Sequence, residues 1–439
     1  SALPPTHPYT ITVPGACAAW VDINNKFGNK NLDQIFEPAI DLAENGFPVS
    51  PITAYFWDLS AKRLLNKSLN GSQLLIDGYA PSTGQIFKNK GLAKTLRLIG
   101  KNGKEEFYKG EISKAIISVI SESGGCMESG DLTNHTSTWE EPIFIEFQGK
   151  RIWECPPNGQ GLAALLALNI LKNFDIQNLP LLSAERFHLE IEAMRLAFAD
   201  AWFYIADPVT NPAPLNELLS VEYAHQRASL IDIHKSFDHI EHGEPPATSD
   251  TVYFCVVDKE GNACSFINSN YMGFGTGIVP SGYGFSLQNR GHNFSLDPSQ
   301  PNHLAPGKRP YHTIIPAMAT DPRNNNLIGP FGVMGGFMQP QGHMQVAISL
   351  FADYLNPQDS LDLPRFCIEP NMNGQIIAFE HGIDVKTIHK LEEMGHRIRQ
   401  VTGMERAIFG RGQIILRDNE SGVCIAGSDP RADGCAMTL

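Results

Sequence analysis

Residues 251–270 read TVYFCVVDKEGNACSFINSN, and this stretch decides the expected fold. Residues 251–257 are β-branched and aromatic, which is the composition of a buried strand. In the next five residues, Asp258 to Asn262, Gly261 stands where a type I turn with a bulge needs a positive φ. The stretch therefore predicts a β-hairpin.

The expected hairpin brings two hydroxyl groups together at its open end. If Asp258 faces Asn262 across the turn, the ladder pairs Thr251 with Ser269. On spacing alone this is an ordinary cross-strand pair, which stabilises a sheet by about 0.2–1 kcal/mol. A register slip of one residue would place Asn268 or Asn270 opposite Thr251 instead.

The composition predicts a globular chain with a large core. The 439 residues are 42% hydrophobic and 18% charged, enough for one large domain or two to three ordinary ones. A net charge of −13 argues against nucleic acid and anionic membranes as partners, since both need a basic surface. The longest apolar stretch, residues 161–168, is too short to span a bilayer.

The eight cysteines show neither a CxxC pair nor the spacing of a zinc site. The sequence therefore predicts no disulfide framework, no metal site and no cofactor. The chain starts at Ser1 with no visible targeting segment. The compartment stays open, with the cytoplasm slightly favoured.

Strands and helices are expected in both halves of the chain. Residues 142–147 and 150–155 predict a hairpin, and an apolar helix and a long helix follow at residues 161–171 and 183–205. Residues 234–249 show no periodicity and predict an exposed loop. This order of elements predicts an α/β fold with large sheets.

Residues 328–333 predict a further strand, which ends at Gly335-Gly336. A helix is expected after it, from about residue 342 to residue 350. Two glycines before a helix present amide N–H groups that have no acceptor within the helix, as an oxyanion requires. Such a pair is more often only a tight turn between a strand and a helix.

Five motifs then give the chain a family resemblance. They are TVYFCVVDKEGNACSF, FGTGIV, APGKRP, GGFMQPQ and the terminal GSDPR. In this order they resemble the γ-glutamyltranspeptidase family of N-terminal nucleophile hydrolases, from about residue 13 to the end. The resemblance implies a four-layer αββα sandwich, here without part of the family's N-terminal region.

The resemblance also implies that the chain cuts itself. The cut bond would be Asp250–Thr251, which gives a large-subunit segment, residues 1–250, and a small-subunit segment, residues 251–439. The two segments would form one structural domain. Thr251 would then be the nucleophile, because its newly freed α-amine can act as the base for its own hydroxyl.

Other residues receive roles by the same resemblance. Ser269 takes the place of a threonine that positions the nucleophile, and Gly335 and Gly336 take the place of the oxyanion hole. The residues expected to bind substrate are Asn293, Tyr271, Asn270, Arg290, His312 and Thr313.

The sequence departs from the family pattern in the expected substrate site. Asn293 stands where transpeptidases carry an aspartate for the substrate ammonium, so the ionic partner is lost. His312 and Thr313 replace two serines, and Tyr271 replaces an asparagine. The short segment 295–305 should leave the pocket open to bulkier acyl donors. These features resemble the branch that includes cephalosporin (glutaryl) acylases.

Three hypotheses follow. The first is an autoprocessing hydrolase or transferase for γ-glutamyl amides such as glutathione, with water or an amino acid as acceptor. The second is a glutaryl-type acylase of the same fold. The third is an inactive, truncated paralogue. In the first two, the partners are a small-molecule amide and the two subunits of one precursor, which could assemble further.

Overall fold

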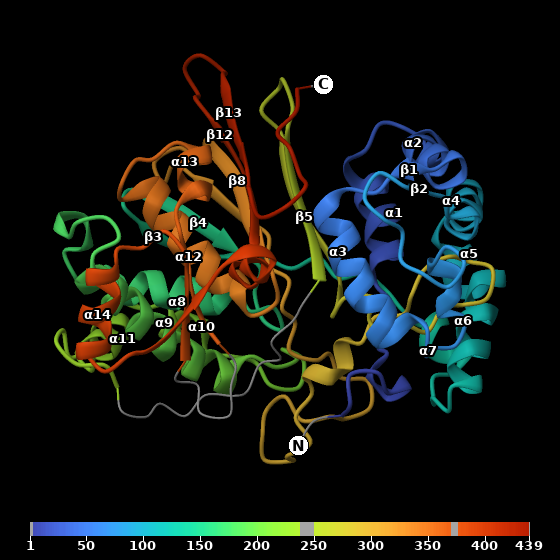
Figure 1. Cartoon of the computed structure of the whole chain (residues 1–439), viewed down its shortest axis with the longest axis horizontal. Coiled ribbons are helices and arrows are strands. Elements are labelled where there is room, and N and C mark those ends of the chain that lie inside the picture. Colours follow the sequence, from blue (N-terminus) through green and yellow to red (C-terminus); the bar gives the residue numbers. More distant parts are fainter. Residues whose placement is uncertain (1–2, 238–249, 370–375, 439) are drawn as a thin grey trace. The chain divides into compact units, whose positions relative to one another are not determined.

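The structure is a computed structural model that describes residues 3–237, 250–369 and 376–438. The chain forms two compact units. Figure 1 labels the helices and strands and colours the chain along its sequence. Unit 1 comprises Ser1–Trp139 and Ser269–His292, and unit 2 comprises Glu140–Asn268 and Asn293–Leu439. These boundaries reflect packing. They test neither the predicted cut after Asp250 nor the prediction of one structural domain.

Unit 1 is mainly helical. Its helices are α1 (Ala16–Phe27), α2 (Leu32–Asn45), α3 (Pro51–Ser60), α4 (Lys90–Asn102), α5 (Lys104–Lys109), α6 (Glu111–Glu122) and α7 (Ser129–Thr133). Shorter elements are η1 (Pro8–Thr10), η2 (Ala61–Leu65), η3 (Gly71–Leu74) and an antiparallel pair of strands, β1 (Phe47–Pro48) and β2 (Ile86–Phe87).

Helix α2 shows how the sequence sets these elements. It begins at a capping box in which the backbone N–H of Asn31 donates to Gln34 Oε1 at 3.3 Å. Phe36, Ile40 and Ala43 recur at helical spacing and form its buried face.

Residues 269–292 belong to unit 1 through long-range hydrogen bonds. Asn89 Nδ2 donates to the Gly284 carbonyl at 2.7 Å, and Gln288 Nε2 donates to the Thr12 carbonyl at 2.7 Å. This segment, with η5 (Arg290–Asn293) at its end, contains four of the predicted site residues.

Unit 2 is built on an antiparallel six-stranded sheet in the order β13-β12-β8-β7-β4-β3. Its strands are β3 (Ile143–Phe147), β4 (Lys150–Glu154), β7 (Ala317–Thr320), β8 (Leu327–Met334), β12 (Arg411–Arg417) and β13 (Cys424–Ser428). The β3–β4 hairpin is the one that the sequence predicts, and it pairs Ile145 with Ile152. A smaller sheet contains β9 (Phe366–Ile368), β10 (Ile376–Glu380) and β11 (Arg397–Val401).

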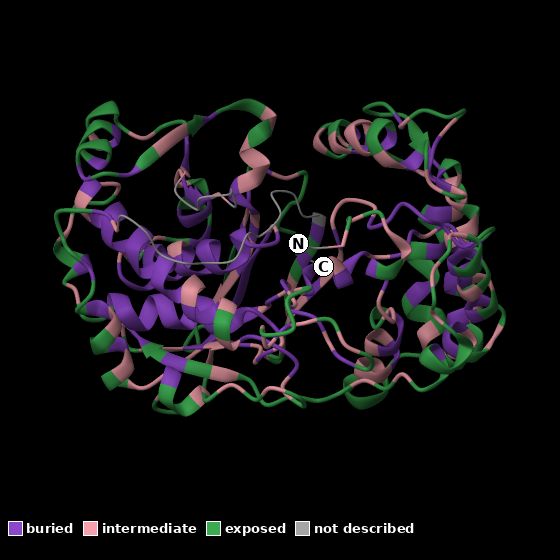
Figure 2. Ribbon diagram, turned by 90° about the horizontal axis from the view of Figure 1, so that it is seen from below, coloured by how far each residue is buried: buried purple, intermediate pink, exposed green. Residues whose placement is uncertain are grey.

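Helices cover the sheets of unit 2. They are α8 (Gly161–Leu171), α9 (Ala184–Tyr204), α10 (Leu215–Leu218), α11 (Val221–Ala228), α12 (Met338–Phe351), α13 (Pro357–Asp362) and α14 (Val385–Glu393), with η4 (Ile176–Asn178) and η6 (Gly403–Phe409). Every residue of α8 is buried, as its Ala/Leu composition predicts. The helices at the centre of this unit are coloured almost wholly as buried (Figure 2).

Helix α12 begins four residues earlier than the sequence suggests. Pro340 lacks an N–H group, and a proline inside a helix normally interrupts it. In the structure Pro340 lies in the first turn, where an N–H group has no acceptor within the helix. The helix can therefore start at Met338, immediately after the Gly335-Gly336 turn.

The predicted hairpin forms a separate two-stranded sheet of β5 (Asp250–Val257) and β6 (Ala263–Tyr271). On β8, a Cβ atom at Gly332 would lie 2.6 Å from the Tyr253 ring, whereas Val333 contacts Gly342 of α12. Neighbouring strand residues point to opposite faces of a sheet. In unit 2 the six-stranded sheet therefore lies between the hairpin and α12, giving the order helices, sheet, sheet.

Two further expectations can be compared with the structure. None of the described helices is both long and apolar enough to cross a membrane. The eight cysteines are present as free thiols. Most of the predicted loop at residues 234–249 lies outside the described residues.

Candidate active site

The turn of the β5–β6 hairpin has the predicted geometry. The backbone N–H of Asp258 donates to the carbonyl of Asn262 at 2.9 Å, and Gly261 between them has φ +87°. Along the ladder, Phe254 stacks on Phe266 with ring centroids 5.1 Å apart. This pair agrees with the register that would place Thr251 opposite Ser269, and that pairing stays a prediction.

Thr251 is the second residue of β5 and is almost fully covered, with 4% of its surface exposed. The strand continues with alternating burial, because Tyr253 is buried while Val252 and Phe254 are exposed. A hydroxyl in this position is fixed by the strand on which it lies.

The Gly335-Gly336 turn joins the end of β8 to α12. Gly335 has φ +139° and Gly336 has φ +59°, and a Cβ atom at Gly335 would lie 3.1 Å from Gly410 Cα. The two carbonyls accept hydrogen bonds from the N–H groups of Met338 and Gln339 in the first turn of α12. Among the residues that the structure describes, neither glycine N–H donates to a backbone acceptor. The turn can thus offer two N–H groups to an anion.

Gln160 connects this turn to a second predicted part of the site. Its side chain is fully buried, and Nε2 donates to the carbonyls of Gly336 at 2.7 Å and Thr313 at 2.6 Å. Its Oε1 lies 3.3 Å from the donating hydroxyl of Tyr311. Gln160 was not predicted from the sequence, because a glutamine before a helix gives no signal of what its amide will contact.

Of the residues predicted to bind substrate in unit 2, His312 and Thr313 lie on the segment that Gln160 holds, and Asn293 bonds to it from η5. His312 exchanges backbone hydrogen bonds with Asn158 and Gln160, at 2.8 and 3.0 Å, and Thr313 is fully buried. Asn293 Nδ2 donates to the Tyr311 carbonyl at 3.0 Å. Asn293, His312, Thr313 and Gly336 are therefore linked through shared hydrogen-bond partners.

A buried pair supports α12 from the sheet side. Glu154 Oε1 on β4 and His343 Nδ1 on α12 are 2.6 Å apart, and both side chains are at most 1% exposed. Burial raises the pKa of Glu154. The contact fixes α12 against the strand that leads to Gln160.

The other predicted site residues belong to unit 1. Ser269 Oγ accepts a hydrogen bond of 2.8 Å from the Tyr271 N–H, and Asn270 Nδ2 donates to Ser286 Oγ at 3.2 Å. The Arg290 guanidinium lies over the Tyr271 ring, 4.7 Å from its centroid. Both are buried, and burial lowers the pKa of Arg290 to about 10. Their union with Thr251 in one active site stays a prediction.

Comparison with known proteins identifies the family. The γ-glutamyltranspeptidase family model matches residues 1–439. The chain belongs to the γ-glutamyltranspeptidase family. It is 34% identical over 432 residues to the glutathione hydrolase-like YwrD proenzyme of Bacillus subtilis, covering 98% of this chain and 81% of that protein. It is 30% identical over 433 residues to the oxamate amidohydrolase proenzyme of Klebsiella pneumoniae, covering 97% and 80%.

A solved structure confirms the fold. The cephalosporin acylase from Bacillus halodurans superimposes with a TM-score of 0.89 at 42% identity, covering 99% of this chain and 79% of that one. The predicted N-terminal nucleophile hydrolase fold is therefore correct, and the helix, sheet and sheet order of unit 2 corresponds to three of its four layers. Several members of this γ-glutamyltranspeptidase family are named proenzymes.

Proposed function

We propose that this γ-glutamyltranspeptidase family member cuts itself at Asp250–Thr251 and then hydrolyses or transfers the acyl group of γ-glutamyl amides. The observation that carries the proposal is the position of Thr251 near the start of β5, in a chain that matches the family over its whole length. The proenzyme names of its relatives agree with such a precursor.

The chemistry follows from the groups at the start of the hairpin. In the precursor, the Thr251 hydroxyl attacks the carbonyl of Asp250, and the peptide bond is replaced by an ester that water hydrolyses. This leaves Thr251 with a free α-amine, which can take the proton of its own hydroxyl. The same hydroxyl then attacks the substrate amide, the amine product leaves, and water or an amino acid releases the acyl group.

The N–H groups of Gly335 and Gly336 are proposed to stabilise the oxyanion of both reactions. One such donor is worth about 10²–10³-fold in rate in hydrolases that have been dissected by mutation. Ser269 is proposed to hold the nucleophile through its hydroxyl.

A second candidate is hydrolysis of glutaryl-type amides, which lack the α-ammonium group of a γ-glutamyl donor. Asn293 favours it, since its Nδ2 already donates to the Tyr311 carbonyl and an amide carries no charge for an ammonium. The 42% identity with the cephalosporin acylase of Bacillus halodurans agrees with this alternative.

A side-by-side assay separates the candidates. Purified protein is given γ-glutamyl and glutaryl anilides, with Thr251→Ala as the matched inactive control. Faster γ-glutamyl hydrolysis supports the first candidate, and faster glutaryl hydrolysis supports the second. Equal hydrolysis rates for the wild-type chain and Thr251→Ala would contradict both candidate functions.

A further inference from the structure

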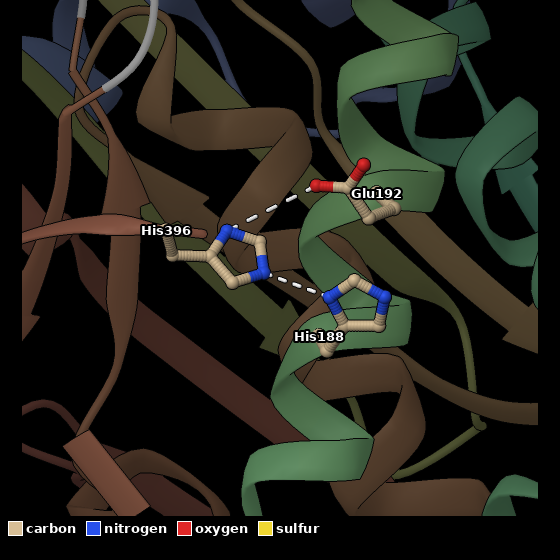
Figure 3. A group of neighbouring side chains, drawn as sticks. All are labelled: His188, Glu192 and His396. Carbon is tan, nitrogen blue, oxygen red and sulfur yellow. Dashed lines mark hydrogen bonds and ion pairs between the residues drawn. The ribbon is translucent and has the colours of Figure 1, made fainter. Parts of the chain in front are cut away.

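Three side chains that can bind metals form a buried cluster in unit 2, and the proposed function does not use them. His188 and Glu192 lie one turn apart on α9, and His396 lies directly before β11 (Figure 3). One nitrogen or oxygen atom from each lies within 4.8 Å of the others. The His396 and Glu192 side chains are at most 1% exposed.

The hydrogen bonds around the cluster assign its protons. His188 Nε2 is 2.7 Å from the carbonyl of Asp232, which can only accept, so this nitrogen carries a proton. His188 Nδ1 then offers a lone pair to His396 Nε2 at 2.8 Å, and a single proton lies between the two nitrogens. Two neutral rings in this arrangement leave His396 Nδ1 without a proton.

That nitrogen faces a carboxylate. His396 Nδ1 lies 3.9 Å from Glu192 Oε1 and has no hydrogen-bond partner among the described residues. Glu192 is itself fixed, because Arg195 donates to Oε1 at 2.8 Å and the Phe237 N–H donates to Oε2 at 2.9 Å. His396 Nδ1 and Glu192 Oε1, two atoms with lone pairs, thus face each other in a buried site. This arrangement costs free energy unless a bound proton or cation compensates the repulsion.

We propose that the cluster is a binding site for a borderline divalent cation such as Zn²⁺, held between His188 Nδ1 and His396 Nε2. The metal replaces the proton on His396 Nε2, and that proton moves to Nδ1, where Glu192 accepts it. Each imidazole then donates its other N–H to an oxygen, His188 to the Asp232 carbonyl and His396 to the carboxylate. This is the usual environment of a metal-ligating histidine.

One small movement of the His396 ring accommodates both the metal at Nε2 and the hydrogen bond from Nδ1 to Glu192. Nitrogens bound to Zn²⁺ at about 2.0–2.1 Å in tetrahedral geometry are roughly 3.3 Å apart, so the 2.8 Å separation must widen. A hydrogen bond from His396 Nδ1 to Glu192 needs about 3 Å, so the 3.9 Å separation must shorten. Displacement of the His396 ring away from His188 and toward Glu192 achieves the two together.

The charges around the cluster predict its selectivity. Imidazole donors favour Zn²⁺, Co²⁺, Ni²⁺ and Cu²⁺ over Mg²⁺ and Ca²⁺. The positive charge of Arg195 next to Glu192 opposes a cation, so Arg195→Gln should strengthen binding severalfold. The competing explanation is a second proton on His396, which would donate to Glu192 without any metal.

Metal binding by the chelator-treated full chain separates these explanations. The exposed thiols of Cys126, Cys264, Cys424 and Cys435 are first blocked by alkylation. The proposal expects one equivalent of Zn²⁺ and a melting temperature that rises by several degrees with excess Zn²⁺. Bound Co²⁺ should show a visible spectrum with imidazole nitrogen ligands and without a thiolate band.

Variants identify the site. His396→Gln should weaken Zn²⁺ binding at least tenfold, and Glu192→Gln should weaken it about 10–100-fold through the lost partner of the ligand. His389→Gln, at an exposed histidine of α14, should bind like the wild type. No stoichiometric binding by the wild-type chain, or equal binding by folded His396→Gln, would overturn the proposal whether or not Thr251 is a nucleophile.

Discussion

The side-chain amide of Gln160 donates a 2.7 Å hydrogen bond to the backbone carbonyl of Gly336. The same nitrogen donates to the carbonyl of Thr313, and the amide oxygen accepts from the Tyr311 hydroxyl. One buried side chain therefore holds the proposed oxyanion turn and the proposed substrate segment at a fixed separation. Precise placement of such groups contributes strongly to catalysis.

Gln160→Glu tests this link. A carboxylate would point acceptor atoms at two carbonyl oxygens, so we expect a loss of about 1–3 kcal/mol in stability and at least a ~10-fold lower kcat. Gln160→Met keeps the volume without the polar atoms and should lower kcat while leaving KM nearly unchanged. Both are measured by denaturant unfolding and steady-state kinetics. A fully active Gln160→Glu protein would show that Gln160 positions nothing.

Gly335→Ala tests the oxyanion turn. Its φ of +139° suits glycine alone, and Gly410 Cα leaves little room for a methyl group. We expect self-cleavage and hydrolysis to slow by at least ~100-fold if the two N–H groups are displaced. Gly149→Ala is the control, because Gly149 also has positive φ but has open space around it. Normal rates in Gly335→Ala would argue against an oxyanion role.

Asn293→Asp tests substrate preference. A carboxylate at this position can pair with an α-ammonium, so the ratio of kcat/KM for γ-glutamyl over glutaryl anilide should rise about tenfold. The variant also loses the donor to the Tyr311 carbonyl, and we expect it to be about 1–3 kcal/mol less stable. Asn302→Asp loses a similar buried bond, to the Asn293 carbonyl, and should not change the ratio. An unchanged ratio in Asn293→Asp would place the ammonium site elsewhere.

Glu190 predicts a pH dependence of stability. Burial, opposed by Arg186, raises its pKa from 4.5 to about 7. The folded state therefore binds the Glu190 proton more strongly than the unfolded state does. The resulting stabilisation of the fold is fully present below about pH 4.5 and is lost as the pH rises through about 7. Glu190→Gln should match the wild type at pH 5 and be about 1–3 kcal/mol more stable at pH 8.

Denaturant unfolding across this pH range measures the effect. Glu185→Gln, on the same helix but with a side chain that is 44% exposed, is the control and should change the slope little. A wild-type chain with the same pH slope as Glu190→Gln would mean that Glu190 is already ionised at pH 5.

Local patterns predicted the hairpin because its signals lie within one stretch. The β-branched run and the turn at Gly261 are both sequence-local. The run predicted a buried strand, whereas Val252, Phe254 and Val256 are exposed in the structure, so its apolar composition did not reveal which face is covered. The start of α12 was predicted too late, since Pro340 lies in the first turn of the helix, where a proline is tolerated.

Contacts between distant residues were not predictable in this way. Gln160 meets Gly336, and His188 meets His396, across long stretches of chain. No periodicity or spacing within either segment encodes such a meeting, since it depends on how the layers stack. The spacing of the cysteines predicted no metal site, and the proposed site contains no cysteine.

The intact mass of the purified wild-type chain tests the central claim most directly. The account predicts two fragments, the second beginning with Thr251 and carrying a free α-amine, and a single uncut chain for Thr251→Ala. A wild-type protein that remains one covalent chain after prolonged incubation, or that is cut at another bond, would contradict it.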